Sequence, residues 1–80
     1  MLPTPEQIKE YIQSNLACEH VHVVGDGSHF EAVIVSNEFA GKRPIQRHQL
    51  VYAALGDRMK QEIHALSMKT LTPEEFANNG

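Results

Sequence analysis

Four apolar residues near the start of the chain recur with the spacing of one helix face. Ile8 is followed at three, four and eight positions by Tyr11, Ile12 and Leu16. Just before this stripe, Thr4 precedes Pro5 and stands three residues before Gln7, which is the pattern of an N-cap residue with a capping box. The spacing therefore predicts a first helix over residues 5–17.

Two segments rich in β-branched residues follow, at 20–24 and 29–36. The sequence Gly25-Asp26-Gly27-Ser28 separates them and is typical of a tight turn, so we predict a β-hairpin. The second segment begins at His29 and carries apolar side chains on most of both faces. A strand of this kind is expected at the centre of a sheet.

A second helix is predicted to begin at Pro44. Within it, Val51, Leu55 and Met59 form an apolar row at intervals of four residues. Gly56 weakens such a helix by about 1 kcal/mol relative to Ala, but does not by itself end it. We therefore expect the helix to continue to Met59.

Residues 64–70 alternate as a third strand, and Thr72-Pro73-Glu74-Glu75 then repeats the helix-start pattern before a short last helix around Phe76. A strand, a helix and a returning strand usually form a right-handed parallel crossover, so the second and third strands are expected to run in the same direction. The predicted order is helix, strand, strand, helix, strand, short helix.

Eighty residues, of which 41% are hydrophobic, suffice for one thin core, and we expect a single domain over 1–80. The net charge of −3 argues against a general polyanion binder, although residues 42–60 carry five Lys and Arg against one Asp. Cys18 is the only cysteine, so no internal disulfide can form, and the N-terminus lacks a signal-peptide pattern. These features predict a cytoplasmic protein without a membrane segment.

Five histidines make a metal site the first chemical hypothesis, because neutral imidazole suits zinc and iron. His20 and His22 share one strand face, but two ligands leave half of a tetrahedral site empty. His48, on the second helix, is interpreted as structural. His29 and His64 open the two strands that we expect to be parallel, so both belong at one end of the sheet. They too form half a site, which thiolates from a partner protein would complete.

The sequence contains two further groups of residues that could carry chemistry. Asp26, Ser28 and His29 contain the residue types of a catalytic triad, but neighbours in a turn project in different directions, so the turn interpretation is preferred. No phosphate-binding loop occurs in the sequence, which argues against nucleotide hydrolysis.

The basic residues around the second helix suit a nucleic-acid backbone, a solvated helix face or an acidic protein partner. They are Lys42, Arg43, Arg47, Arg58 and Lys60.

Several short motifs occur in a fixed order along nearly the whole chain. They are Gly25-Asp26-Gly27-Ser28-His29-Phe30, Val35-Ser36 with Phe39-x-Gly41, Arg47-His48-x-x-Val51-x-x-x-Leu55, His64-Ala65-Leu66 and Thr70-x-Thr72-Pro73-x-Glu75. Together they resemble the BolA family, and the first motif resembles its acid-stress-linked bacterial subgroup. The resemblance implies an α+β fold similar to the class II KH domain, with a three-stranded mixed sheet and no enzyme activity. It also implies a cytosolic partnership with monothiol glutaredoxins in iron–sulfur cluster trafficking, through a shared [2Fe-2S] cluster.

The resemblance also implies site residues. His64 matches the C-terminal cluster-ligand histidine of the family. The second family ligand is a His or Cys between the first two strands, for which His29 is the match and His22 the alternative. Cys18 precedes that loop and is not counted. The active-site cysteine of the partner and the thiol of bound glutathione would complete the coordination, and the chain alone is expected to be a monomer or a weak homodimer without the cluster.

Some BolA proteins are also described as DNA-binding transcriptional regulators. For this chain, that alternative would use the basic helix 42–60, with Lys42, Arg43, Arg47 and Arg58 as the contacts to nucleic acid.

Overall fold

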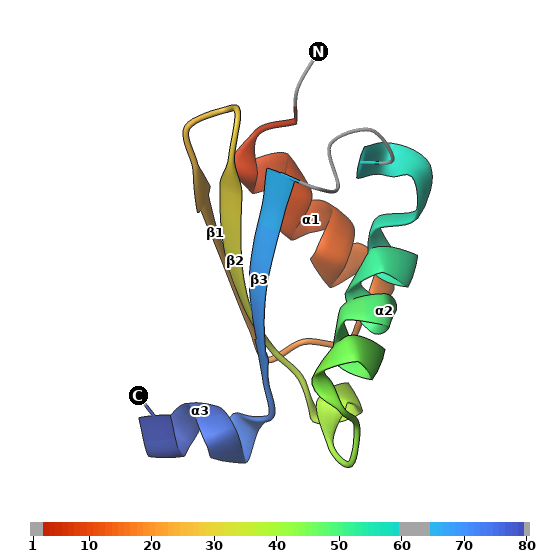
Figure 1. Ribbon diagram of the computed structural model, residues 1–80, viewed down its shortest axis with the longest axis vertical. Helices are drawn as coiled ribbons and strands as arrows, with labels where there is room; N and C mark the ends of the chain where they lie inside the picture. Colours follow the sequence, from red (N-terminus) through yellow and green to blue (C-terminus); the bar gives the residue numbers. More distant parts are fainter. Residues whose placement is uncertain (1–2, 60–64, 80) are drawn as a thin grey trace.

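The computed structural model describes residues 3–59 and 65–79, and its elements follow one another in the predicted order (Figure 1). The helices are α1 (Pro5–Asn15), α2 (Pro44–Leu55) and α3 (Pro73–Asn79). The strands are β1 (His20–Gly25), β2 (Phe30–Val35) and β3 (Leu66–Leu71). Two short 3-10 helices, η1 (Asn37–Phe39) and η2 (Gly56–Met59), flank α2.

The three strands form one mixed sheet in the order β1-β2-β3. β1 and β2 pair antiparallel, with Gly25 opposite Phe30, whereas β2 and β3 run parallel, with Phe30 opposite Leu66. The predicted hairpin, the central second strand and the parallel third strand are therefore confirmed. Both α1 and α2 lie against the same side of the sheet (Figure 1). The other side is largely uncovered, and it is called the open face below.

The start of α1 is as predicted. The Thr4 hydroxyl accepts a hydrogen bond from the Gln7 backbone N–H at 3.1 Å, and the Gln7 side-chain oxygen accepts one from the Thr4 N–H at 2.9 Å. These two bonds satisfy donors that have no partner within the helix. The helix ends at Asn15, slightly before the predicted boundary.

The core lies between the sheet and the two long helices. Apolar residues from α1, all three strands, η1 and α2 meet there and are almost completely buried. They are Ile8, Ile12, Val21, Phe30, Ala32, Ile34, Phe39, Val51, Leu55 and Leu66. Burial of this apolar area is the main favourable contribution to folding of such a small domain.

The second helix is shorter than predicted. Val51 and Leu55 are fully buried, as the apolar row requires, but α2 ends at Leu55 and Met59 lies in the 3-10 helix η2. Gly56 is the cause, because it takes a φ of +60°, and a residue with a side chain rarely adopts that conformation. The expectation that the helix continues through Gly56 is therefore wrong.

The last strand, β3, leads directly into α3 at the end of the sheet. The described part of the third strand begins at Leu66, and the predicted beginning at His64 lies outside the described residues. At the start of α3, the Glu75 N–H donates to the Thr72 hydroxyl at 3.1 Å, and the Thr72 N–H donates to the Glu75 carboxylate at 2.9 Å. This is the predicted helix-start pattern. None of the helices within residues 3–59 and 65–79 is long and apolar enough to cross a membrane.

Candidate functional site

The turn between β1 and β2 is organised by one carboxylate. Asp26 Oδ1 accepts hydrogen bonds from the Ser28 N–H, the Ser28 hydroxyl and the His29 N–H, each at 3.0 Å. These bonds stabilise the charged carboxylate and hold the pKa of Asp26 below its usual value, the Ser28 backbone N–H having the largest effect. The Ser28 hydroxyl is thus bonded to Asp26, and the turn interpretation of this trio is confirmed.

His29 lies at the end of this turn, directly before β2 rather than within it. Its side chain is exposed, and ring atom Nε2 lies 3.3 Å from the Ser67 hydroxyl on β3. Because Phe30 stands opposite Leu66, His29 is at the end of the sheet where β3 begins. His64 and Lys60, two further residues singled out from the sequence, lie outside the described residues.

His20 and His22 do share one face of β1, as predicted. Their rings are stacked with centroids 6.4 Å apart, and the other neighbour of His20 is Phe76 of α3, at 5.3 Å. His22 stands opposite Val33. Val33 lies four residues along the chain after His29. At the rise of a strand this separation is about 13 Å, so His22 and His29 occupy different parts of the open face.

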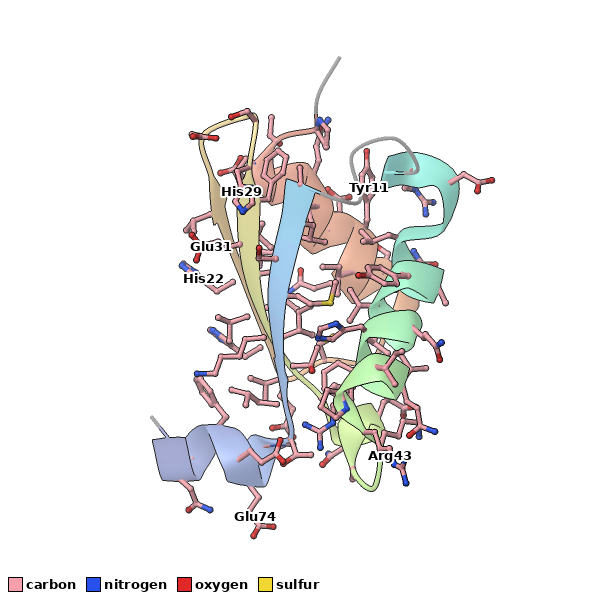
Figure 2. All side chains as sticks on the ribbon, in the orientation of Figure 1. Tyr11, His22, His29, Glu31, Arg43 and Glu74 are labelled. Atoms are coloured by element: carbon pink, nitrogen blue, oxygen red, sulfur yellow. The ribbon has the colours of Figure 1, made fainter. Side chains whose placement is uncertain are left out.

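The exposed part of the open face is mostly polar. By strand alternation this face carries His20, His22, Val24, Glu31, Val33, Val35, Ser67, Lys69 and Leu71, of which Val35 is buried. Figure 2 shows His29, Glu31 and His22 on this side, away from α1 and α2. A shallow depression of about 240 Å³ lies between β2 and β3, and its lining residues are Glu31, Ala32, Val33, Ser67, Met68 and Lys69.

The donors of the open face fit part of a metal or cluster site. His29 offers an exposed imidazole, a normal ligand for iron in clusters that combine histidine with cysteine. Within the described residues, no group of three or more His, Cys, Asp or Glu side chains is arranged to hold a metal ion. Cys18 is half-buried against the core. Since Cys18 is the only cysteine in the sequence, any thiolate at His29 must come from another molecule.

The four basic residues of the nucleic-acid hypothesis have different environments. Arg47 is largely buried: its guanidinium binds Glu75 of α3 at 2.7 Å and donates to the Thr70 carbonyl at 3.1 Å. Arg58 lies over the ring of Tyr11 at 5.1 Å. Only Lys42 and Arg43 point into solvent without a described side-chain contact among residues 3–59 and 65–79. Figure 2 shows Arg43 at the start of α2, far from His29.

His48 is half-buried and its ring meets that of Tyr52 edge-on at 6.5 Å, in keeping with the structural interpretation.

Ser67 was not singled out from the sequence, although it is the side chain that contacts His29. Only the register of β2 with β3 reveals this contact, and no tight turn fixes that register, because α2 lies between the two strands in the chain.

The family described as BolA-like protein matches residues 4–75. Protein BOLA2 of Arabidopsis thaliana is 45% identical, with 91% of this chain and 83% of that protein covered. The acid stress protein IbaG of Escherichia coli is 36% identical, over 91% and 88%. The DNA-binding transcriptional regulator BolA of Haemophilus influenzae is 42% identical, over 85% and 71%.

The fold is also found among solved structures. A BolA homologue from Coxiella burnetii superposes with a TM-score of 0.84 at 45% sequence identity, with 95% of this chain and 99% of that chain covered. The expected α+β fold of the class II KH type, with helices and strands in the order α-β-β-α-β-α, is therefore confirmed.

Proposed function

The chain belongs to the BolA family, and from this premise we propose that it is a non-enzymatic partner of a monothiol glutaredoxin, with which it shares a [2Fe-2S] cluster. In this function it takes part in iron–sulfur cluster trafficking, or in regulation by iron or stress, in the reducing environment of the cytoplasm. His29 and His64 provide the ligands from this chain, and the glutaredoxin cysteine and glutathione provide the thiolates.

The position of His29 is the observation that carries the proposal. The ring is exposed on the open face, at the end of β2 that lies beside the start of β3. His64 precedes the first residue of β3 by two positions in the sequence. The position of His29 therefore supports its role as one of the two ligands, and favours it over His22, which stands opposite Val33 in the middle of the face.

The chemistry of this chain is limited to binding. A neutral imidazole presents one nitrogen lone pair to iron, and it must be deprotonated at that nitrogen to do so. When bound, the cluster would supply electron-transfer chemistry. Two imidazoles in place of two thiolates would raise its reduction potential. The His29 ring contacts the Ser67 hydroxyl, and the residues of the open face that are exposed remain accessible to a second protein.

The test is anaerobic cluster reconstitution of this protein with a monothiol glutaredoxin and glutathione. Size exclusion and visible circular dichroism follow the product. We expect a one-to-one complex whose spectrum differs from that of the glutaredoxin homodimer. Separate elution with an unchanged glutaredoxin spectrum would contradict the proposal.

Matched variants then identify the ligands. His29→Ala and His64→Ala are expected to abolish the mixed spectrum while leaving the far-ultraviolet spectrum of the free chain unchanged. His22→Ala is the control, because it removes an exposed histidine from the same face. Loss of the mixed spectrum in His22→Ala but not in His29→Ala would reverse the assignment.

A second candidate function is binding to DNA. The observation in its favour is that Lys42 and Arg43 are exposed at the start of α2, on a chain related to a DNA-binding regulator. Since Arg47 is bonded internally, few phosphate contacts are expected, and affinity should fall only shallowly with salt. Titration of a labelled duplex at several salt concentrations tests this, with Lys42→Gln and Arg43→Gln compared with Lys9→Gln on α1. Absence of binding at low salt removes this candidate.

A further inference from the structure

Ser67 contacts the ring of His29 from the neighbouring strand. Its hydroxyl oxygen lies 3.3 Å from Nε2 of His29. In the parallel register Ser67 stands opposite Glu31. Glu31 follows His29 by two residues, so the serine and histidine side chains are on the same face. Both residues are exposed, and neither is part of the core. The contact therefore acts on the orientation of one imidazole rather than on the packing of the fold.

The backbone of His29 is held as well. Its N–H donates to the Asp26 carboxylate at 3.0 Å, and its carbonyl accepts from the Asp26 N–H at 3.2 Å. The turn thus fixes where the side chain begins, and Ser67 fixes where the ring points. A ligand that is already ordered loses less conformational entropy on binding than a free one.

We propose that Ser67 is a positioning residue that selects the nitrogen through which His29 binds iron. This inference rests on the function proposed above. A neutral imidazole carries its proton on one nitrogen and offers the other as a ligand, and ligating histidines almost always donate the remaining N–H to an oxygen. The Ser67 hydroxyl can either accept from or donate to Nε2, and in both cases it occupies that nitrogen. Nδ1 is therefore the nitrogen left for iron, and its lone pair is available in the tautomer in which Nε2–H donates to Ser67.

The other histidines of the open face lack this arrangement. The ring of His22 stacks on that of His20, and both planes are nearly parallel. Stacking orders a ring, but it does not determine which nitrogen carries the proton. Of the three described histidines on or beside the open face, His29 is therefore the one with a preselected ligating atom.

The first experiment uses the free chain. Long-range ¹H–¹⁵N spectra at about pH 8, above the ordinary histidine pKa of about 6.5, report the tautomer of each ring. Ser67→Thr keeps the hydroxyl, whereas Ser67→Val has the same shape without it, and both residues favour strands. We expect a dominant Nε2–H form of His29 in the wild type and in Ser67→Thr, and a larger Nδ1–H fraction with faster ring motion in Ser67→Val. His20 and His22 serve as internal controls.

The second experiment uses the complex with glutaredoxin. Removing such a supporting partner typically weakens metal binding by about 10–100-fold. Cluster loss to an iron chelator should therefore be about that much faster in Ser67→Val, and within a few-fold of wild type in Ser67→Thr. Identical tautomers and identical loss rates in all three proteins would overturn the inference.

Failure of this inference is distinguishable from failure of the proposed function. If the wild type acquires the cluster and Ser67→Val behaves identically, only the role of Ser67 is refuted. If the tautomer depends on Ser67 but no cluster is shared with glutaredoxin, the proposed function fails and the positioning role for iron fails with it.

Discussion

Arg47 and Glu75 form a two-pronged ion pair that ties α2 to α3. One guanidinium nitrogen lies 2.7 Å from Glu75 Oε1, and the other lies 3.3 Å from Oε2. The same guanidinium donates to the backbone carbonyls of Lys42 and Thr70, at 3.0 and 3.1 Å. One side chain thus joins the start of α2, the end of β3 and the start of α3. Arg47 therefore has a structural role in this chain.

Arg47→Ala is expected to destabilise the fold. It removes a charged donor from two carbonyls and one carboxylate, a loss on the order of 2 kcal/mol. Arg47→Lys should recover only part of this, because an ammonium group cannot make the two-pronged contact. Urea unfolding of both variants measures the effect. Arg43→Ala is the matched control, being exposed on the same helix start, and its effect should stay within about 0.5 kcal/mol. Equal effects at both positions would contradict the structural role of Arg47.

The same pair predicts how stability depends on acidity. The Arg47 hydrogen bond, followed by that from the Thr72 backbone, lowers the pKa of Glu75 from its ordinary 4.5 to about 2. Between these values the unfolded chain binds more protons than the folded one, so stability falls as the pH decreases from about 4.5 to about 2. Glu75→Gln should flatten this part of the stability curve.

Urea unfolding at several pH values measures that slope. Asp26 contributes in the same direction, since its pKa is also lowered, so a residual slope is expected in Glu75→Gln. Asp26→Asn is the companion variant. A wild-type slope that persists unchanged in Glu75→Gln would show that the ion pair does not lower the carboxyl pKa.

Local patterns predicted most of the fold because its elements begin with strong signals. The capping residues Thr4 and Thr72, the turn at Asp26 and the apolar rows of the helices each act within a few residues of themselves. The end of α2 was the exception. A glycine inside a helical pattern is compatible with both continuation and termination, and only the path required to reach β3 decides between them.

The candidate site was less accessible from the sequence. His29 could be selected because strand order brings it to the start of β3, but its contact with Ser67 depends on register. The use of Arg47 depends on where α3 lies, and Glu75 is 28 positions away in the chain. Long-range partners of this kind follow from packing of the whole domain, which a single sequence does not encode in any local pattern.

Gly25→Ala is expected to disturb the turn that carries His29. A β-carbon at this position would lie 2.5 Å from Phe30 Cδ1 and 2.6 Å from the His29 carbonyl oxygen. Because Phe30 is buried, relief requires a backbone shift, at a cost of about 1–3 kcal/mol. Urea unfolding measures the cost, and amide chemical shifts of His29 report the shift of the turn.

Gly27→Ala is the control for this prediction. Apart from Gly27 and its two neighbours in the chain, no atom of the described residues lies within 4 Å of the added carbon, but the φ of +97° makes alanine strained by about 1 kcal/mol. It should lower stability without displacing the Phe30 ring. If Gly25→Ala leaves both stability and the His29 amide unchanged, the close approach of the two strands at this point is incorrect.

Cys18 is expected to react slowly for a thiol in a small protein. It is half-buried and packs against the core, and this burial raises the pKa of the thiol above its ordinary value. Each unit of increase lowers the thiolate fraction at neutral pH about tenfold, and the thiolate is the reactive form. Alkylation at pH 7 should therefore be several-fold slower than in the chain unfolded by urea.

The folded control is a Cys18→Ser protein that carries Ser14→Cys at an exposed position of α1. Its cysteine should react at the rate of the unfolded chain. Equal rates for Cys18 and the control cysteine would show that Cys18 is exposed and available to bind a metal.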